Sequence, residues 1–302
     1  MITVPIVLLT YARLDHTKRT IKALLQNDLA SESDLIVYSD AARSIDKQDA
    51  VGEVRAYIET ICGFRSVTIK HCSENYGLSK SIISGVTEVL QQSDRVIVLE
   101  DDMVTSPHFL SYMNDALERY AEDKSVASIH GYIYPITQPL QEAFFIPGAD
   151  CWGWATWKRG WECFNSDGQY LLDELKRRKL IRAFDFNGTF PYSKMLEDQI
   201  KGKNDSWAIR WYASAFLAGK LTLYPGRSLV QNIGNDNSGT HCGETDTYDT
   251  VLSKTPINLD KISVTSSDEA LYAFEAYFKQ VKISLSKRLT RRLSNLLSTS
   301  WK

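Results

Sequence analysis

The amino-acid sequence predicts an α/β protein with a mostly parallel β-sheet flanked by helices. Short apolar runs typical of buried strands alternate with amphipathic helical segments through residues 1–125. Residues 96–99 are continuously apolar, as expected for a parallel strand that is covered on both faces. Polar residues follow four of these runs, at the strand ends where α/β sheets bind ligands.

The first half of the chain reads as four strand–helix pairs. In the first expected helix, Ile21, Leu24 and Leu25 recur at helical spacing. Pro107 is well placed to begin the fourth helix. The expected strands are "TVPIVLLTYAR" (3–13), "SDLIVYSD" (33–40), "RSVTIKHCS" (65–73) and "RVIVLEDD" (95–102), and the expected helices are 16–26, 47–62, 78–92 and 107–123.

The fourth strand runs into three consecutive acids, Glu100, Asp101 and Asp102. Carboxylates crowded at a buried strand end repel one another and resist desolvation, so a cation or hydrogen-bond donors must compensate them. The pattern therefore indicates a site for a divalent metal ion. The alternative is a solvated turn whose acids favour the N-terminus of the following helix. The other polar residues at strand ends are Thr10, Tyr11, Arg13, Ser39, Asp40, Asn75, Tyr76 and Gly77.

The bulk composition excludes several classes of function. The chain has 302 residues, 43% hydrophobic and 24% charged, which is typical of a globular protein with a sizeable core. Its net charge of −2 gives no sign of a nucleic-acid partner. Five cysteines without a CxxC spacing argue against a zinc knuckle or a disulfide framework. No signal peptide and no membrane span of ~20 apolar residues is recognised, so a cytoplasmic location is expected.

The second half differs in composition. Six of the seven tryptophans lie between Trp152 and Trp211, in "CWGWATWKRGWECF" and "DSWAIRWYASAF". They indicate either a saccharide-binding surface, because indole stacks on the CH faces of sugars, or an aromatic core. "LTLYPGRSLVQNIGNDNSGTHCGE" reads as a short strand that enters a polar, glycine-rich loop. We predict one domain over residues 1–275, with halves at 1–125 and 126–275.

Residues 276–302 are predicted to form a basic amphipathic C-terminal helix. Such a helix suits peripheral contact with an anionic membrane, at the inner face of the cytoplasmic membrane. Alternatively, its leucines dock on the body and its cations are merely solvated. The apolar stripe is Val281, Leu285, Leu289, Leu293 and Leu296, and the cations are Lys282, Lys287, Arg288, Arg291 and Arg292.

Several segments resemble GT-A glycosyltransferases, most closely family 2 and the inverting N-acetylglucosaminyltransferase I type. "VLEDDMVTSPHFL" is similar to their acidic motif, in which a strand, Glu-Asp-Asp and "xxxPxFF" follow in order. "VPIVLLTYARLDHTKRTIKALL", "IVYSD", "ENYGLSKSI" and "CWGWATWKRGW" match further segments in order over residues 1–245. The resemblance implies a GT-A, Rossmann-like fold with a nucleotide-sugar-binding half (1–125) and an aromatic-rich acceptor-binding half (126–275). The commoner family 2 motif is Asp-x-Asp, and Glu100 replaces its first Asp here.

The resemblance also implies roles for individual residues. Asp102 would ligate Mn²⁺ or Mg²⁺, which as a Lewis acid stabilises a departing diphosphate. Glu100 and Asp101 would hydrogen-bond the sugar and ribose of a nucleotide sugar, expected to be UDP-linked. His241 would complete the metal shell, or is an ordinary histidine of a surface loop. Asp40 would contact the base or ribose, and the remaining nucleotide-sugar-binding residues would be Thr10, Tyr11, Arg13, Asn75 and Gly77.

Inversion at the anomeric carbon requires a carboxylate that deprotonates the acceptor hydroxyl. Asp205 is the predicted catalytic base, because the inverting relatives carry an acid just before a tryptophan at this place. Alternatively, Asp205 with Ser206 only caps the following helix. Glu197 and Asp198 are weaker candidates that fit a solvated helix face. The predicted contacts to the acceptor or donor sugar are Asp150, Trp152 and Trp154.

The expected function is metal-dependent, inverting transfer of a sugar from a nucleotide sugar. The expected acceptor is a saccharide or a lipid-linked oligosaccharide, in the synthesis of a cell-surface polysaccharide such as lipopolysaccharide. One alternative is a nucleotidyltransferase that makes nucleotide sugars, although "LLTYARLDH" lacks the glycine-rich loop of such enzymes. Another is a non-catalytic carbohydrate-binding protein, which leaves the four polar strand ends unexplained.

Overall fold

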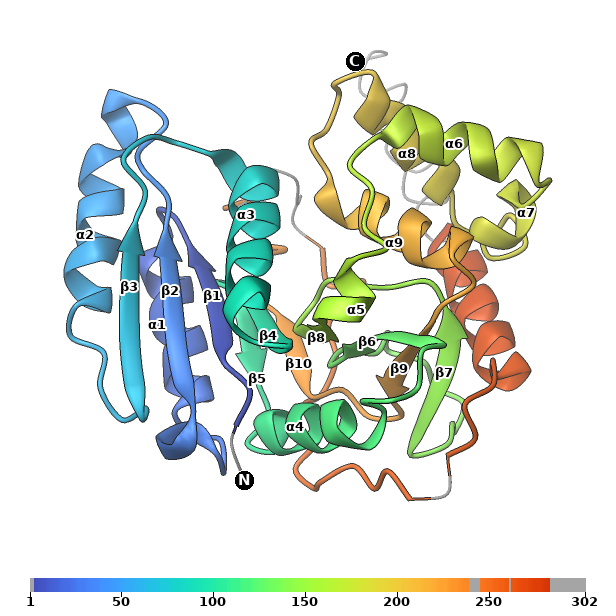
Figure 1. The fold of residues 1–302 in the computed structure, drawn as a ribbon, viewed down its shortest axis with the longest axis horizontal. Coiled ribbons are helices and arrows are strands. Elements are labelled where there is room, and N and C mark those ends of the chain that lie inside the picture. Colours follow the sequence, from blue (N-terminus) through green and yellow to red (C-terminus); the bar gives the residue numbers. More distant parts are fainter. Residues whose placement is uncertain (1–2, 239–244, 261, 283–302) are drawn as a thin grey trace, which may run out of the picture.

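The computed structural model describes residues 3–238, 245–260 and 262–282. Its centre is an eight-stranded, mixed but mostly parallel sheet in the order β3-β2-β1-β4-β8-β6-β9-β7 (Figure 1). The predicted α/β fold is confirmed, and the first four strands lie where the sequence predicts them. The strands of this sheet are β1 (Ile6–Thr10), β2 (Asp34–Ser39), β3 (Ser66–His71), β4 (Arg95–Glu100), β6 (Val126–His130), β7 (Ala143–Pro147), β8 (Trp154–Trp157) and β9 (Leu221–Pro225).

The sheet continues without a break from the first half of the chain into the second. The strands β1 to β4 are parallel, whereas β8 runs antiparallel between β4 and β6. Strand β9 is parallel to β6, and β7 is antiparallel to β9. A separate antiparallel pair joins β5 (Met103–Thr105) to β10 (Val230–Asn232). Strand alternation fades from the sequence after residue 125, so β6, β7 and β8 were not predicted.

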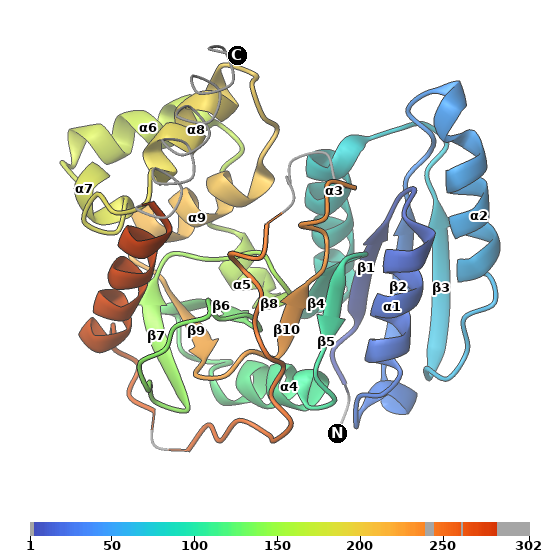
Figure 2. The same ribbon diagram turned by 180° about the vertical axis from the view of Figure 1, so that it is seen from behind.

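Helices cover both faces of the main sheet (Figures 1 and 2). The helices are α1 (Leu14–Leu24), α2 (Gln48–Ile58), α3 (Gly77–Gln92), α4 (Phe109–Arg119), α5 (Lys158–Trp161), α6 (Gly168–Arg177), α7 (Ile181–Phe184), α8 (Tyr192–Ile200) and α9 (Trp207–Leu217), with 3₁₀ turns η1 (Ala30–Glu32) and η2 (Ile45–Lys47). Residues 268–282 are also helical.

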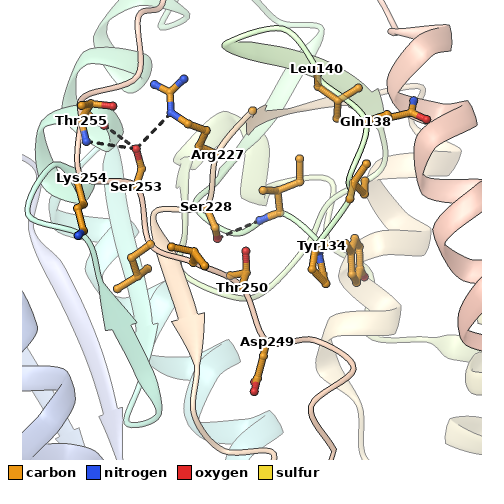
Figure 3. A pocket seen from close by; sticks show the side chains of 16 residues that line it. Tyr134, Gln138, Leu140, Arg227, Ser228, Asp249, Thr250, Ser253, Lys254 and Thr255 are labelled. Atoms are coloured by element: carbon orange, nitrogen blue, oxygen red, sulfur yellow. Dashed lines mark hydrogen bonds between the residues drawn. The ribbon is translucent and has the colours of Figure 1, made fainter.

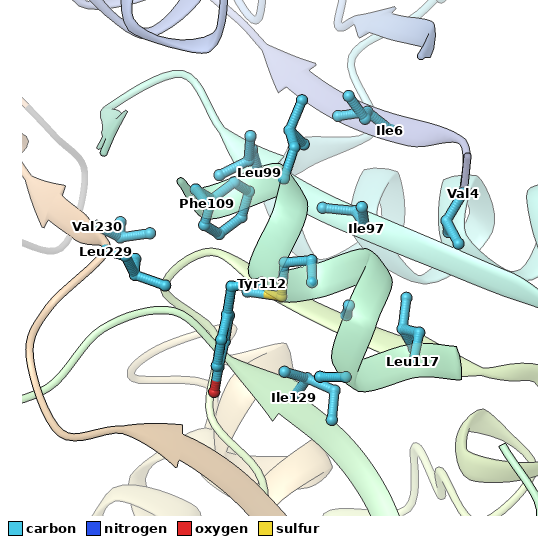
Figure 4. Packing of buried hydrophobic residues seen from close by; sticks show 14 of the residues in the cluster. Val4, Ile6, Ile97, Leu99, Phe109, Tyr112, Leu117, Ile129, Leu229 and Val230 are labelled. Atoms are coloured by element: carbon cyan, nitrogen blue, oxygen red, sulfur yellow. The ribbon is translucent and has the colours of Figure 1, made fainter. Parts of the chain in front are cut away.

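The two faces of the strands enter two different cores, because successive side chains of a strand point to opposite sides. In β1, Ile6 and Leu8 pack with the side of α1, α2 and α4, as Figure 4 shows for Ile6 beside Ile97 and Leu99. Val7 and the other alternate residues pack with α3, α5 and α9. All of these apolar strand residues are essentially inaccessible to solvent, which explains why their runs are continuously hydrophobic.

A third core is mainly aromatic and lies in the second half, among α6 to α9, β7, β9 and the helical residues 268–282. Phe274 and Phe278 of this last helix are 1% exposed, so its described part docks on the body. The helix begins before the predicted boundary at residue 276. The leucine and cation stripe of residues 283–302 lies outside the described residues, so the membrane contact stays a prediction.

Candidate functional site

The acids of the sequence motif lie in the turn between β4 and β5. Glu100 is the last residue of β4, and the side chains of Asp101 and Asp102 are buried. The turn is held from two sides: Thr20 Oγ1 donates to the Asp101 carbonyl at 2.8 Å, and the Ile233 amide donates to the Asp102 carbonyl at 2.9 Å. We name Glu100, Asp101 and Asp102 the acid cluster.

Arg13, directly before α1, lies against two members of the acid cluster. Its Nη2 atom donates a hydrogen bond to Asp101 Oδ1 and lies 2.7 Å from Asp102 Oδ2. Burial would lower the pKa of Arg13, but Asp101 and Asp102 more than compensate and raise it. The other two oxygens, Asp101 Oδ2 and Asp102 Oδ1, are buried without a hydrogen-bond partner among the described residues. Half of the carboxylate oxygens of Asp101 and Asp102 therefore lack a donor among the described residues.

Burial and the neighbouring carboxylates disfavour the ionised forms of Glu100 and Asp101. Burial, together with Asp102 and Asp101, raises the pKa of Glu100 to about 8. Burial also raises the pKa of Asp101 to about 6, although Arg13 opposes this shift. Additional positive charge at this place would stabilise the ionised carboxylates.

The segment after β10 lies directly on the acid cluster. A Cβ atom on Gly234 would lie 2.1 Å from Asp102 Oδ2, so only glycine fits. The segment is also tied to α1, because His16 Nε2 lies 3.2 Å from the Ile233 carbonyl and 3.1 Å from Asp236 Oδ2. No spacing to another polar residue marks His16 for this role in the sequence. His241, the predicted metal ligand further along, lies outside the described residues.

Asp40, at the end of β2, organises the start of α3. Its carboxylate accepts hydrogen bonds from the backbone amides of Ala41, Tyr76 and Gly77, each at 2.9 Å, and from the Asn75 amide at 3.0 Å. Gly77 has φ +72°, a left-handed conformation that suits glycine. Asp40, Asn75 and Gly77 thus come together as predicted from their strand ends, whereas their contact with a base or ribose stays a prediction.

Arg55 of α2 is a residue of this region that the sequence did not reveal. Its guanidinium donates to the Cys72 carbonyl at 2.8 Å and to the Ser39 carbonyl at 3.3 Å. It thereby satisfies backbone carbonyls at the ends of two parallel strands. No motif marks such an arginine, because the contacts are made to backbone atoms.

Thr10 is the last residue of β1, the strand beside β4, and Tyr11 follows it. Thr10 is buried and its hydroxyl donates to the Tyr38 carbonyl at 3.3 Å. The Tyr11 hydroxyl accepts from the Arg43 amide at 3.0 Å and lies at the partly exposed rim. Their predicted place in a nucleotide pocket is not tested by these contacts.

The residues before β8 lie at the same sheet edge as the acid cluster. Trp154 of β8 stands opposite Val98 of β4 on one side and opposite His130 of β6 on the other. Because neighbouring strands are about 4.8 Å apart, the chain around Asp150 passes near Glu100. This approach explains why burial, then Asp150, Glu100 and Asp102, raise the pKa of the Cys151 thiol.

The two tryptophans predicted to contact sugar occupy different environments. Trp154 is 1% exposed and packs against Trp161, Trp207 and Trp211 at 5.4–5.9 Å between ring centroids. Its indole therefore belongs to the core and has no face left for a sugar. Trp152 is partly exposed and packs edge-on against Tyr132 at 4.7 Å. Its sugar contact stays a prediction.

Asp150 is held by neutral groups. Its Oδ1 atom accepts the Cys151 amide at 2.8 Å, and its Oδ2 atom accepts the Tyr224 hydroxyl at 3.1 Å. His130 Nε2 lies 3.7 Å from the same Oδ2 atom. We name Asp150, His130 and Tyr224 the Asp150 centre. Sequence reasoning assigns His130 no functional role, because no partner lies near it in the chain.

Asp205, the predicted base, lies just outside α9. The residue that caps this helix is Ser206, whose hydroxyl accepts the Ile209 amide at 3.2 Å. The Asp205 side chain is 68% exposed and lies 3.4 Å from Arg210, which reaches Ser79 of α3 at 2.6 Å. These three residues line a cavity of about 570 Å³ between α3 and α9. The weaker candidates, Glu197 and Asp198, pair with lysines on α8 and beyond.

A second cavity, of about 550 Å³, lies beyond the Asp150 centre (Figure 3). It is lined by the chain that follows β6, including Tyr134, and by residues 249–255. Arg227 at its wall is fully engaged, with Glu142 at 2.6 Å and 2.9 Å and with Ser253 at 3.3 Å. Its wall combines hydroxyl and charged groups with aliphatic side chains such as Ile133, Ile136 and Leu252.

Within the described residues, the acid cluster by itself does not form a set of three or more side chains arranged as metal ligands. No group of three or more His, Cys, Asp or Glu side chains in this part of the chain is arranged to hold a metal ion. None of the helices in those same ranges is long and apolar enough to cross a membrane.

No protein-family model and no curated protein matches the sequence. Similar solved structures include the mannosyltransferase PcManGT from Pyrobaculum calidifontis in complex with GDP-Man and Mn²⁺, with 15% identity and a TM-score of 0.33 over 44% of this chain and 35% of that chain. S. aureus TarS 1-349 has 10% identity and a TM-score of 0.41 over 76% of this chain and 59% of that chain. Another S. aureus TarS structure has 11% identity and a TM-score of 0.36 over 54% of this chain and 30% of that chain. The match spans less than two thirds of each of these chains. At TM-scores of 0.33 to 0.41, these likenesses leave the function to be read from the chain's own site.

Proposed function

We propose that the chain is a metal-dependent, inverting glycosyltransferase that uses a nucleotide sugar. UDP is the proposed carrier, and a saccharide or lipid-linked saccharide is the proposed acceptor. The observation that carries the proposal is the acid cluster with its unpartnered carboxylate oxygens, placed at the carboxyl ends of parallel strands. The Asp40 network stands at the same edge, two strands away.

The residues present fit a divalent metal ion. Mg²⁺ and Mn²⁺ prefer oxygen ligands and take one or two carboxylates from protein, the rest coming from phosphate and water. The Asp101 Oδ2 and Asp102 Oδ1 atoms, which have no hydrogen-bond partner among the described residues, would supply that number. When bound, the ion would neutralise charge on the diphosphate leaving group.

The chain's own residues would bind and orient the donor. Arg13, already in contact with both aspartates, is placed to pair with a phosphate once a metal ion takes its share of the carboxylates. The segment after β10 covers the acid cluster and would exclude water from it. A carboxylate must still accept the proton of the attacking hydroxyl, and Asp205 and Asp150 are the two candidates.

Ligand binding tests the donor half of the proposal. UDP-sugars and GDP-sugars, each with Mn²⁺, are screened for a rise in melting temperature, because a ligand that binds only the folded state stabilises it. The nucleotide sugar with the largest shift then serves in an assay of nucleoside diphosphate release with soluble saccharide acceptors. Wild type should release the diphosphate only when metal is present.

The matched variants are Asp102→Ala in the acid cluster and Asp49→Ala, an exposed residue of α2. Only Asp102→Ala should lose metal-dependent release. Formation of pyrophosphate with a sugar phosphate and nucleoside triphosphate would instead support a nucleotidyltransferase. Saccharide binding without any turnover would support a carbohydrate-binding protein.

A further inference from the structure

The carboxylate of Asp150 is positioned more firmly than its exposure would suggest. Its side chain is 23% exposed, yet both oxygens are fixed, one by the Cys151 amide and the other by the Tyr224 hydroxyl. Neutral donors orient a carboxylate without neutralising its charge. Asp150 therefore offers a fixed and accessible proton acceptor.

Behind this carboxylate lies an imidazole that fold stability alone does not explain. His130 is 0% exposed, and neither ring nitrogen has a hydrogen-bond partner within the described part of the chain. Its ring lies between those of Tyr224, at 4.8 Å, and Tyr132, at 6.2 Å. Buried polar groups without partners are rare and concentrate at functional sites. The charged atom that lies close to its Nε2 is Asp150 Oδ2, at 3.7 Å.

The Asp150 centre faces the acid cluster across one strand. Cys151 follows Asp150 and lies near carboxylates of both sites. Burial makes the largest contribution to its raised pKa, and Asp150, Glu100 and Asp102 raise it further. The pairing of β8 with β4 thus places the chain around Asp150 at the sheet edge where the acid cluster would hold a donor. The other titratable groups that face Asp150 are the phenols of Tyr132, Tyr134, Tyr192, Tyr212 and Tyr224.

Asp205 has a less suitable environment. It is mostly exposed, and its partner is the cation Arg210. One of its carboxylate oxygens accepts a hydrogen bond from that guanidinium. The cavity that Asp205 lines is walled by α3 and by Arg210, and none of the acid cluster's residues borders it.

We propose that Asp150 accepts the proton of the acceptor hydroxyl, with His130 as a positioning residue, and that Asp205 does not. This inference rests on the proposed function. As the acceptor oxygen bonds to the anomeric carbon, its proton passes to the Asp150 carboxylate. The bond from that carbon to the diphosphate breaks, and the nucleoside diphosphate leaves with the electron pair. Asp150 then returns the proton to solvent through its exposed side.

The test compares Asp150→Asn with Asp205→Asn in the full chain. The assay uses the nucleotide sugar and acceptor that give the greatest wild-type release, and calorimetry measures binding of UDP with Mn²⁺. Asp150→Asn should lower kcat by roughly 10²- to 10⁴-fold, the usual worth of general base catalysis, and leave UDP affinity within twofold. Asp205→Asn should keep kcat within threefold.

The outcomes separate the two proposals. No release by wild type with any nucleotide sugar defeats the proposed function itself. An active wild type whose Asp150→Asn variant keeps more than a tenth of kcat overturns the inference, as does a 100-fold loss in Asp205→Asn. If Asp150→Asn does not fold, Asp150→Glu decides instead: it should lower kcat at least tenfold, and an unchanged kcat overturns the inference.

The positioning role of His130 has its own readout. His130→Phe keeps the ring volume and removes both nitrogens. The acid limb of the kcat–pH profile should move to higher pH, because replacing the polar ring 3.7 Å from Asp150 Oδ2 by an apolar one makes the surroundings of the carboxylate less favourable for its charge. His108→Phe, at the start of α4, is the matched control and should leave the limb unmoved. An unmoved limb in His130→Phe would mean that the ring only fills space.

Discussion

The acid cluster and the Asp150 centre hold their carboxylates in opposite ways, one with a charged partner and the other with groups that carry no fixed charge. In the acid cluster, Asp101 and Asp102 share one guanidinium, and their remaining oxygens are left unpaired. In the Asp150 centre, a single carboxylate meets an amide, a phenol and a buried imidazole, none of which is a fixed charge. The first arrangement suits binding of a cation or an exchange of ion pairs. The second suits an exchange of protons, because the charge of the carboxylate is oriented without being cancelled.

The strongest way to break this comparison is to remove the acid cluster's charge. Asp102→Asn keeps the shape but loses the anionic oxygen that is free to bind a cation. Metal-dependent diphosphate release should fall by roughly 10²- to 10³-fold, the loss typical when one group that stabilises developing charge is removed. Nucleoside diphosphate release at saturating donor measures it. Asp49→Asn should behave as wild type, and equal losses in both variants would contradict a specific role for the acid cluster.

The next largest effect should appear in stability rather than activity. Arg13→Met leaves Asp101 and Asp102 buried without a cation, which should lower the free energy of unfolding by about 2–3 kcal/mol. Arg65→Met removes an exposed partner of Asp34 and should change the free energy of unfolding far less, because solvent screens a surface ion pair. Urea denaturation measures both. A loss at Arg13 no greater than at Arg65 would show that Arg13 does not hold the acid cluster together.

A third variant acts on the Asp150 centre alone. Tyr224→Phe removes the phenol that donates to Asp150 and should cost about 1 kcal/mol of unfolding free energy, the net value of one buried hydrogen bond. Tyr170→Phe, on the exposed side of α6, should cost nothing measurable. Denaturation curves again give the comparison. Affinity for UDP with Mn²⁺ should stay unchanged, and a weakened affinity would mean that the two centres are not separable.

The smallest expected effect is a pH dependence of stability. Burial lowers the pKa of His130 in the folded protein, although Asp150 opposes the shift. The unfolded chain therefore takes up the proton first, so this part of the stability is complete above about pH 6.5 and is lost as the pH falls below it. The free energy of unfolding should drop less between pH 7.5 and 5.5 in His130→Phe than in wild type, by about 1 kcal/mol. A parallel drop in both proteins would contradict it.

The sequence predicts the first half of the fold well because its local signals agree with its packing. Residues 96–99 are apolar without interruption since both faces of β4 are covered, and the acids stand where that cover ends. Asp40, Asn75 and Gly77 also meet as expected, because parallel strands bring their carboxyl ends to one edge. These are properties that one strand and its following turn carry by themselves.

The Asp150 centre could not be predicted in the same way. His130 and Asp150 belong to different segments, and Tyr224 lies more than seventy residues further along. Their meeting depends on β8 entering the sheet antiparallel between β4 and β6, an order that hydrophobic pattern does not specify. Trp154 shows the same limit, since an indole in a sugar-binding surface and an indole in a core have the same local sequence.

The strand β8 has one more consequence. It is hydrogen-bonded to β4 on one side and to β6 on the other, so the backbone beneath both carboxylate sites belongs to one rigid body. The spacing between them is then fixed when the chain folds and does not wait for a substrate to arrive. A substrate must therefore match the distance between the two carboxylate sites, and the sheet sets that distance.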